Sequence, residues 1–509
     1  MNDNQFEVII IGGGATGLGV AVESISRGYS TILVEGEDFG SGTSSKSTKL
    51  IHGGIRYLAN LDFTLVQEGL KERFYFLQNA PHLAYVNQYL IPLYTTWERI
   101  KFYFGVKIYD LLAWNLRIGK SSFLNKLQTL QVAPKLKSYN LRGASVYYDG
   151  QFDDSRMLIS LLRTFEDLGG KAYNYHKVID FIKNERNQII GVKVLNVLEN
   201  ITSNIYAKVI INATGTLTDD LMNIDEPTKQ NQHVAAAQGT HLVFNKEVFN
   251  SSHTLVIPET RDGRILFVVP WHDKVIVGTT DIAVKTSTLE PMPLPEEIDF
   301  ILETFNQYLS HKVTYKDIKS VFCGQRPLVK PQYKTNSAKI SRKHEIFISN
   351  SNLISIVGGK WTIYRLMGED TINFIIKHGL LVNKKPSITK NLKLYGATTE
   401  NINYPLKVYG IDHIKIRQIQ TEFNDTSKLH PNLPYYTAEI VYQIRYEMAK
   451  TLIDVLARRT RALYLDAKAT IEIAPHVAKI MAQELKQNEA WIIKQLAQFN
   501  TYAKHYIIK

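Results

Sequence analysis

Cysteine is nearly absent from this sequence, which has a single one, Cys323, among 509 residues. One cysteine cannot form an internal disulfide or hold a cysteine-ligated metal cluster, and such scarcity suits a reducing compartment. We interpret Cys323 as a packing residue, and we predict no metal site. No stretch reaches the ~18 to 20 apolar residues that a membrane-spanning helix requires. The first predicted strand begins so soon after Met1 that we expect no cleaved signal or transit peptide.

Long blocks of one charge sign, internal repeats and low-complexity tracts are also missing. A nucleic-acid-binding arm usually contains such a block, so we predict no nucleic-acid partner. The chain nevertheless has 60 Lys and Arg against 48 Asp and Glu, a formal net charge of +12. A positive surface suits nucleic acid, an anionic membrane or a phosphorylated substrate, and charge alone does not choose among them.

The N-terminal stretch follows the order strand, glycine turn, helix, strand. The apolar run Val8 to Ile11 is typical of a parallel strand buried on both faces. The spacing of Gly12, Gly14 and Gly17 permits a tight turn, close approach of a pyrophosphate and close packing of the helix. The N-terminus of that helix offers N–H groups to an anion, and Glu35 at the end of the next strand can bind a ribose hydroxyl. Together these features predict a dinucleotide site, although the glycines alone would also suit an ordinary α/β turn.

The next segment, residues 36–58, is rich in small, hydroxyl-bearing and cationic side chains. Because it follows a nucleotide-binding pattern, we expect these side chains to hydrogen-bond the phosphates or ring edge of a cofactor. The candidates are Thr43, Ser44, Ser45, Ser47 and Lys49. His52 is a further candidate, and the alternative is an ordinary loop histidine whose ring is satisfied locally.

Two later strands lead into glycine turns that can return to the same cofactor. The strand expected over Ala207 to Asn212 runs into Ala213-Thr214-Gly215, as in many FAD-binding folds. A short strand over Leu353 to Val357 is followed by glycines and a helix, so a second helix N-terminus can face the cofactor. The additional cofactor candidates are Ala213, Gly215, Gly359 and Thr362.

The chain is long enough for two or three domains with a large core. Residues from Gln232 to Asp281 are strand-rich and predict a second, largely antiparallel domain. After a linker over Lys384 to Tyr404 the pattern is almost wholly helical, with apolar residues at helical spacing over Ala438 to Leu463 and Ala474 to Phe499. We therefore predict an α/β fold in which a Rossmann-like FAD-binding domain is interleaved with an antiparallel-sheet substrate domain, followed by an all-helical C-terminal domain.

These domains divide the chain into an FAD-dependent oxidoreductase region, 1–390, and a C-terminal helical domain, 391–509. Within the first region, the FAD-binding parts are expected at about 1–80, 150–230 and 345–380, and the substrate parts at about 81–149 and 231–344.

The segment from Trp97 to Arg117 has the composition of a helix that lies in a membrane surface. Its apolar residues follow helical spacing, and the cations Lys101, Lys107 and Lys120 are interleaved with or close to them. Trp114 lies near its end. The alternative is a helix packed on the protein's own core, and the sequence of this segment favours neither.

Several motifs resemble those of the FAD-dependent glycerol-3-phosphate dehydrogenase family, in the same order and from end to end. They are the glycine turn, TSSKSTKLIHGGIRYL, VVPW, VGTTD, GQRPL, GGKWTIYR and RRTRALYLDAKA. One departure is Gly215-Thr216-Leu217, where the family usually has a proline and an aromatic residue after the glycine. The sequence shows no calcium-loop pattern near its C-terminus, so the bacterial form of the family is the better match.

The resemblance implies oxidation of sn-glycerol 3-phosphate to dihydroxyacetone phosphate, with electrons passed through FAD to a membrane quinone. It also implies peripheral binding to an anionic membrane surface, at the cytoplasmic face of a bacterial inner membrane, and a homodimer is a possible assembly. His241 is the natural base for the hydroxyl proton, because histidine titrates near neutral pH. Arg326 can grip the substrate phosphate or stabilise a developing oxyanion. The other substrate-binding residues implied by similarity are Arg56, Tyr57, Thr279 and Lys360.

Three alternatives stay open. His241 can be a structural strand histidine and Arg326 a surface salt-bridge residue. The chain can instead be an oxidase that acts on glycerol 3-phosphate or an amino acid and reduces oxygen directly. A flavin-containing binding protein with a basic surface, for example one that binds RNA, is the non-enzymatic alternative.

Overall fold

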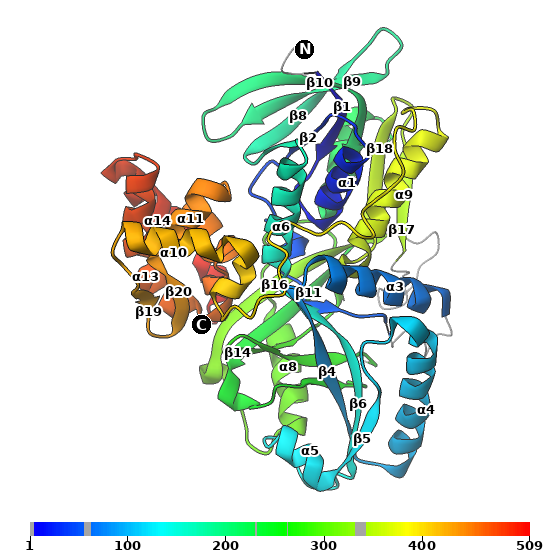
Figure 1. Ribbon diagram of the computed structural model, residues 1–509, viewed down its shortest axis with the longest axis vertical. Helices are drawn as coiled ribbons and strands as arrows, with labels where there is room; N and C mark the ends of the chain where they lie inside the picture. Colours follow the sequence, from blue (N-terminus) through cyan, green and yellow to red (C-terminus); the bar gives the residue numbers. More distant parts are fainter. Residues whose placement is uncertain (1–4, 55–62, 230–231, 262, 331–342, 509) are drawn as a thin grey trace.

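The computed structural model describes residues 5–54, 63–229, 232–261, 263–330 and 343–508, and in these ranges most strands belong to two sheets (Figure 1). The first sheet has the strand order β17-β18-β10-β1-β2-β7, and the hairpin β8-β9 extends it by pairing with β10. Its strands are β1 (Gln5–Ile11), β2 (Thr31–Val34), β7 (Lys171–Tyr173), β8 (His176–Lys183), β9 (Ile189–Asn196), β10 (Ile201–Asn212), β17 (His344–Ile348) and β18 (Leu353–Gly358).

Strand β1 lies in the interior of this sheet, as its continuous apolar run predicts. It pairs in parallel with β2 on one side and with β10 on the other, so that Val8 faces both Thr31 and Val209. Val8 and Ile9 are completely buried, on opposite faces of the sheet. The carboxyl ends of β1, β2, β10 and β18 therefore meet at one edge, which is where α/β sheets bind ligands.

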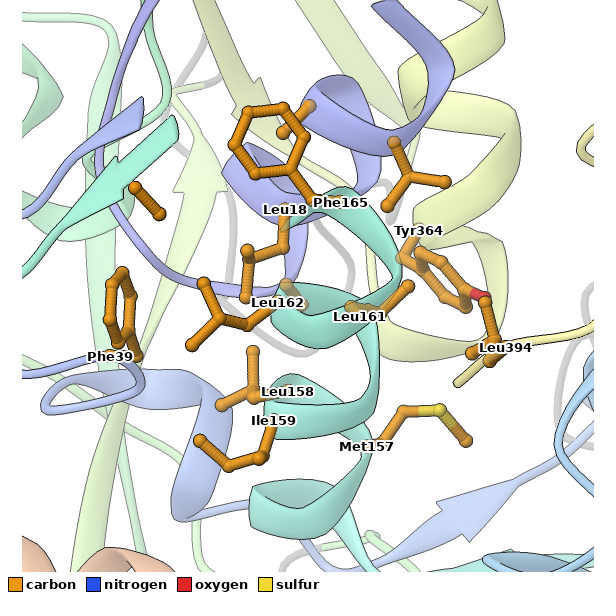
Figure 2. Packing of buried hydrophobic residues seen from close by; sticks show 14 of the residues in the cluster. Leu18, Phe39, Met157, Leu158, Ile159, Leu161, Leu162, Phe165, Tyr364 and Leu394 are labelled. Atoms are coloured by element: carbon orange, nitrogen blue, oxygen red, sulfur yellow. The ribbon is translucent and has the colours of Figure 1, made fainter. Parts of the chain in front are cut away.

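Three helices pack together against one face of the first sheet: α1 (Ala15–Ser26), α6 (Asp154–Asp167) and α9 (Tyr364–Lys377). Figure 2 shows Leu158 and Leu162 of α6 in this core, close to Leu18 of α1. Helices α1 and α9 approach closely, because a Cβ added to Gly19 would lie 2.6 Å from the carbonyl oxygen of Tyr364. This packing fixes the N-termini of α1 and α9 at the ligand-binding edge.

The second sheet is largely antiparallel and follows the order β15-β11-β14-β13-β12-β4-β6-β3, with β16 paired to β11 and β5 to β6. One parallel pair, β12 with β4, interrupts the antiparallel pattern. Helix α8 (Pro295–Tyr308) packs on this sheet over a separate core. The strands are β3 (Leu50–Ile51), β4 (Ala84–Leu93), β5 (Ser122–Asn125), β6 (Gly143–Phe152), β11 (Val234–Asn245), β12 (Thr254–Ile257), β13 (Leu266–Trp271), β14 (Lys274–Gly278), β15 (Ile282–Ala283) and β16 (Ile318–Val329).

Two helices between β3 and β5 lie beside the second sheet, α3 (Phe63–Asn79) and α4 (Thr96–Ala113). Helix α4 begins with a capping box in which Thr95 and Glu98 bond each other's backbone N–H groups. One face of α4 packs inward through Val106 and Tyr109. The other face exposes large apolar side chains: Trp97, Ile100, Tyr103, Phe104, Ile108 and Leu111, with Trp114 just beyond the helix. Along the described ranges, no helix combines the length and apolar character needed to cross a membrane.

The C-terminal part forms a group of helices beside both sheets (Figure 1). It consists of α10 (His413–Glu422), α11 (Thr437–Tyr446), a π-helical segment Asp454–Arg459, α12 (Ala462–Leu465), α13 (Ala467–Glu484) and α14 (Glu489–Ala503). A small hairpin of β19 (Lys428–His430) and β20 (Leu433–Tyr436) precedes α11. The predicted fold class is confirmed, and this hairpin is the feature that the helical pattern did not predict.

Both stretches with apolar residues at helical spacing are helical but interrupted. Helix α11 ends at Tyr446, because Glu447 turns to bind Arg156 and the carboxylate of Asp454 accepts from the N–H groups of Lys450 and Thr451. The second span divides near Lys486, which has φ = +54°, and α14 starts afresh with Asn488 capping the N–H of Trp491. In both places polar side chains end a helix that the apolar spacing would continue.

Candidate active site

A cavity of about 660 Å³ lies between the ligand-binding edge of the first sheet and the second sheet. That volume is in the range of sites for small molecules and cofactors. Its wall combines the N-terminal glycine turn, the segment after β2, residues 213–217 after β10, the turn after β18, and side chains of the second sheet. Segments that are hundreds of residues apart in the sequence therefore meet at one site.

One end of the cavity is built from backbone and glycines. Gly12 has φ = +112°, and a Cβ on it would lie 2.6 Å from the carbonyl oxygen of Ala213. Gly17 lies inside α1, where a Cβ would collide with the carbonyl oxygen of Gly12 at 1.9 Å. Gly14 lines the cavity directly at the N-terminus of α1. Gly12 and Gly17 thus have the turn and packing geometry that their spacing predicts, and the approach of a pyrophosphate to Gly14 stays a prediction.

Glu35 lies at the end of β2 beside this turn, as predicted. Its carboxylate accepts hydrogen bonds from the backbone N–H of Gly13 at 2.6 Å and of Glu37 at 2.8 Å. The side chain also lines the cavity. A carboxylate fixed in this way beside a glycine turn is placed to accept from a ribose hydroxyl.

The described residues of segment 36–58, which are 36–54, divide between the cavity wall and the layer behind it. Thr43, Ser44 and His52 line the cavity, and the hydroxyl of Ser44 accepts from the N–H of Ala15 at 3.0 Å. Lys49 also lines it, but its ammonium group is bound to both carboxylate oxygens of Asp154, at 2.7 and 2.8 Å. Ser45 is buried behind the wall, with its hydroxyl 3.4 Å from that of Tyr464. The predicted residues Ala213, Gly215, Gly359 and Thr362 all line the cavity.

The opposite end of the cavity is built from polar and charged side chains of the second sheet. His241 on β11 and Arg326 on β16 belong to paired strands, in which His241 faces Phe322 and Ala237 faces Arg326. His241 and Arg326 therefore project from the same face of the sheet, and both line the cavity. The structure brings together the two residues to which the sequence analysis assigns catalysis.

Glycines make room for these two side chains. A Cβ on Gly239 would lie 2.5 Å from Nη2 of Arg326 and also 2.5 Å from the hydroxyl of Thr279. A Cβ on Gly278 would lie 2.5 Å from Cδ2 of His241. Larger residues at these two positions would displace the side chains that line this end of the cavity.

Arg326 is held by Thr279, which the sequence analysis named, and by Asp281, which it did not. Its guanidinium group forms a 3.1 Å ion pair with Asp281 and donates to the hydroxyl of Thr279 at 3.2 Å. About a quarter of the side chain remains exposed. Asp281 belongs to the VGTTD motif, so that motif was the available signal, although it pointed to Thr279 alone.

His241 is almost fully buried, and its ring stacks on Phe322 with centroids 4.6 Å apart. Burial, followed by the charges of Arg326 and Lys49, holds the pKa of His241 well below its usual value. The ring is therefore neutral near pH 7 and able to accept a proton. Its Nε2 lies 2.9 Å from the hydroxyl of Thr48, a neighbour that the sequence analysis missed.

Lys360 also lines the cavity, next to Gly359 in the turn after β18. Arg56 and Tyr57 lie outside the described residues, so their predicted role stays a prediction. Cys323 is buried on β16, and burial raises the pKa of its thiol to about 12, as expected of a packing residue rather than a nucleophile.

Comparisons with known proteins agree on one family. A family model described as FAD dependent oxidoreductase matches residues 7–363, and one described as the C-terminal domain of alpha-glycerophosphate oxidase matches residues 352–491. A probable mitochondrial glycerol-3-phosphate dehydrogenase of Caenorhabditis elegans is 37% identical over 98% of this chain and 73% of its own length. The chain belongs to the FAD-dependent glycerol-3-phosphate dehydrogenase family.

Other members support the same assignment. The mitochondrial glycerol-3-phosphate dehydrogenase of Homo sapiens is 36% identical over 96% of this chain and 72% of its own length. The structure of glycerol-3-phosphate dehydrogenase from Bacillus halodurans, complexed with FAD, covers 100% of this chain and 96% of its own at 28% identity, with a TM-score of 0.80. These relatives include both mitochondrial and bacterial proteins, so the bacterial form stays a prediction.

FAD is the cofactor of this family member, and the cavity fits it. The fit rests on three observations: glycines where a Cβ would fill the turn, a helix N-terminus without a side-chain cap at Gly14, and the fixed carboxylate of Glu35. In a dinucleotide-binding turn the pyrophosphate lies at the helix N-terminus and the acid binds the ribose, which is the arrangement seen here.

Proposed function

We propose that this enzyme oxidises sn-glycerol 3-phosphate to dihydroxyacetone phosphate and passes the electrons through FAD to a membrane quinone. The observation that carries the proposal is a single cavity with a dinucleotide-binding turn at one end and His241 with Arg326 at the other. Bound FAD supplies a two-electron acceptor for the hydride that leaves C2 of the substrate. The chain supplies the phosphate-binding and proton-accepting groups.

We assign the phosphate of the substrate to the cations of the reaction end, which is the end of the cavity where His241 and Arg326 lie. Arg326 can donate to a phosphate from the N–H groups that its protein partners leave, and Asp281, Thr279 and the carbonyl oxygen of Thr280 fix the plane of its guanidinium group. Lys360 adds a second positive charge from the opposite wall of the cavity. Arg56 and Tyr57 remain candidates for the same role by family resemblance.

The hydroxyl proton of the substrate is assigned to His241. A neutral imidazole can accept a proton, and burial, followed by the positive charges of Arg326 and Lys49, keeps the ring neutral in the absence of substrate by lowering its pKa. A doubly negative phosphate beside Arg326 offsets that positive field, so substrate binding raises the pKa of His241 and strengthens it as a base. The contact with Thr48 fixes the plane of the ring.

Anaerobic reduction tests this function. Adding sn-glycerol 3-phosphate to the enzyme without oxygen should bleach the visible absorption of the flavin, and sn-glycerol 1-phosphate should do so much more slowly. A flavin-containing binding protein would show no bleaching with either compound, and an amino-acid oxidase would respond to amino acids instead.

The membrane contact is assigned to helix α4. Its outward face exposes Trp97, Phe104 and Leu111 at 71%, 60% and 64%, far more than a helix packed on its own core would. Lys101 and Lys120 are exposed near this face and can bind anionic lipid. We propose peripheral binding at the cytoplasmic face of a bacterial inner membrane, where the quinone is available. Co-sedimentation with anionic and neutral vesicles tests it.

An oxidase is the second candidate, because the family model matching residues 352–491 is described from alpha-glycerophosphate oxidase. The structure of L-alpha-glycerophosphate oxidase from Mycoplasma pneumoniae covers 76% of this chain at 16% identity with a TM-score of 0.57, which shows a shared fold. Turnover with a quinone analogue should greatly exceed turnover with oxygen. Stoichiometric peroxide at a comparable rate would identify an oxidase.

A further inference from the structure

The segment Glu35 to Gly42 encloses the glycine turn. Glu35 accepts from the N–H of Gly13, and the N–H of Gly40 donates to the carbonyl oxygen of Gly13 at 3.1 Å. Phe39 packs against the same residue, since a Cβ on Gly13 would lie 2.6 Å from its ring. The position of this segment therefore determines the position of both the turn and the ribose-binding carboxylate.

Asp38, in the middle of this segment, takes no part in the cavity wall and is completely buried. Its two oxygens accept from Nη1 and Nη2 of Arg459 at 2.7 and 2.9 Å, a bidentate pair. A third donor is Nε of Arg458 at 2.7 Å, and a fourth is the side-chain amide of Asn174 at 2.9 Å. The positive charges of the two arginines hold the pKa of Asp38 well below its usual value despite burial, so the carboxylate stays ionised.

Both arginines come from the π-helical segment of the C-terminal helices, and Arg459 is 421 positions from Asp38 in the sequence. Arg458 also pairs with Asp454 at 2.6 Å, so two arginines and two aspartates balance one another's charge away from water. Removing one member of such a buried set leaves another charge uncompensated, which is strongly destabilising locally. The set therefore fixes Asp38 more firmly than a surface loop is usually fixed.

We propose that Arg458 and Arg459 are positioning residues for the cofactor. They hold Asp38, and through the Glu35–Gly42 segment they hold Glu35 and the backbone of Gly13 in the geometry that binds FAD. The C-terminal helices thereby contribute to FAD affinity although neither arginine lines the cavity. This role is additional to the proposed reaction and does not depend on which electron acceptor is used.

The test compares two buried arginine-to-lysine changes. Arg459→Lys keeps the charge but loses the bidentate fork, so the Asp38 side chain is held by fewer hydrogen bonds. The matched control is Arg156→Lys: Arg156 on α6 is also buried and also makes a bidentate pair with a C-terminal residue, Glu447, at 2.7 and 2.5 Å. The side chains of that pair do not bond the Glu35–Gly42 segment. The backbone carbonyl oxygen of Glu447 accepts from Arg459 at 3.1 and 2.9 Å, so this control shows whether disturbing that neighbourhood alone, without touching Asp38, changes FAD binding.

Apoprotein of each variant is titrated with FAD, and the flavin fluorescence gives the dissociation constant. Arg459→Lys should raise it roughly tenfold or more, the size expected for one lost hydrogen bond to a charged group, while Arg156→Lys should leave it near the native value. The midpoint temperature of thermal unfolding of the apoprotein should be lower in both variants than in the native protein. An unchanged FAD dissociation constant in Arg459→Lys, or an equal rise in Arg156→Lys, would overturn the proposal.

A second measurement needs no variant. Because coupling between two sites is reciprocal, bound FAD should slow hydrogen exchange of the backbone amides in the Asp454–Arg459 segment. The amides of α13 serve as the reference, since α13 lies in the same group of helices without contacting Asp38. Equal protection of both segments on FAD binding would show general stabilisation and would contradict the positioning role.

A further variant, Asn174→Ala, removes one of the four donors to Asp38. It should raise the FAD dissociation constant by less than Arg459→Lys does.

Discussion

The two ends of the cavity are built in opposite ways. The dinucleotide end is made of backbone and of glycines such as Gly12 and Gly17. Neighbouring backbone lies so close to these glycines that a Cβ atom would collide with it. The reaction end is made of charged and polar side chains, His241 and Arg326, that occupy the space left by Gly239 and Gly278. One end should therefore fail when atoms are added, and the other when atoms are removed.

Adding atoms at the dinucleotide end should have the largest effect. Gly14→Val places two methyl groups in the cavity wall at the N-terminus of α1, where a Cβ would already lie 3.1 Å from the hydroxyl of Ser44. We expect the purified variant to lose its visible flavin absorption and, with it, all activity. The matched control is Gly105→Ala in α4, where a Cβ meets nothing within 4 Å and FAD content should stay native.

Removing atoms at the reaction end should lower the rate and leave the cofactor bound. His241→Ala should slow anaerobic flavin reduction by about 10²- to 10⁴-fold, the typical cost of losing a positioned general base. Stopped-flow absorption measures the rate, and the flavin spectrum measures the retained FAD. Cys323→Ala, a truncation on the adjacent strand, should reduce flavin at nearly the native rate. A native rate in His241→Ala would make the histidine structural.

Shortening the arginine should have a smaller effect. Arg326→Lys keeps one charge but loses the bidentate fork, so the apparent affinity for glycerol 3-phosphate should fall, by roughly tenfold for one hydrogen bond to a charged group. Arg326→Ala should weaken both binding and turnover further. Steady-state kinetics with an artificial dye separate the two effects. A native KM in both variants would assign the phosphate to other cations.

The pH dependence should reveal the charge at position 326. The pKa of His241 is lowered by burial and then by Arg326 and Lys49. As the pH falls, kcat/KM should therefore stay constant through pH 6.5 and decline only at lower pH, where the base becomes protonated. In Arg326→Gln, the loss of the positive charge raises the pKa of His241, and the acid limb should move to higher pH. Profiles of both enzymes, measured with saturating dye, check the direction. An acid limb that moves downward would exclude His241 as the group that titrates.

Changes to the lysines on or next to α4 should affect vesicle binding but neither FAD binding nor the rate of reaction. Replacing Lys101, Lys107 and Lys120 by glutamate removes attraction to anionic lipid of about 1 kcal/mol per cation, so the variant should shift from sedimented vesicles to the supernatant. Its FAD content and dye-linked rate should remain native. The control replaces Lys479, Lys486 and Lys494, which are exposed on or next to the C-terminal helices, by glutamate. Equal loss of vesicle binding in both variants would assign binding to net charge rather than to α4.

The sequence predicted the dinucleotide end more completely than the reaction end. Its signal is local: an apolar strand, three glycines and an acid within a short span specify the turn, because backbone geometry there depends on neighbours in the chain. Lys49 was read as a cofactor ligand, yet it pairs with Asp154, which lies 105 positions away. Asp281 and Thr48 were missed because their roles arise from the pairing of distant strands.

Helix α4 and the C-terminal region show the same limit. The apolar spacing of α4 is compatible with a buried or an exposed face, and the structure shows that Trp97, Phe104 and Leu111 on that face are mostly exposed. The helical spacing over Ala438 to Leu463 contains no break, but the buried contacts of Glu447 and Asp454 interrupt the helix there. Periodicity records where apolar residues fall and contains no information about distant ionic partners.

The place of β1 in the sheet has a consequence for synthesis on the ribosome. One edge of β1 pairs with β10. Gln5 can therefore pair with Tyr206 only after roughly 200 further residues have been synthesised. At typical rates of about 5 to 20 residues per second, the apolar strand remains without that neighbour for roughly 10 to 40 s. The turn after β18, residues 358–360, emerges later still. We therefore expect nascent chains that end before residue 353 to bind no FAD, and to depend on chaperones to shield Val8 to Ile11 until the cofactor can enter.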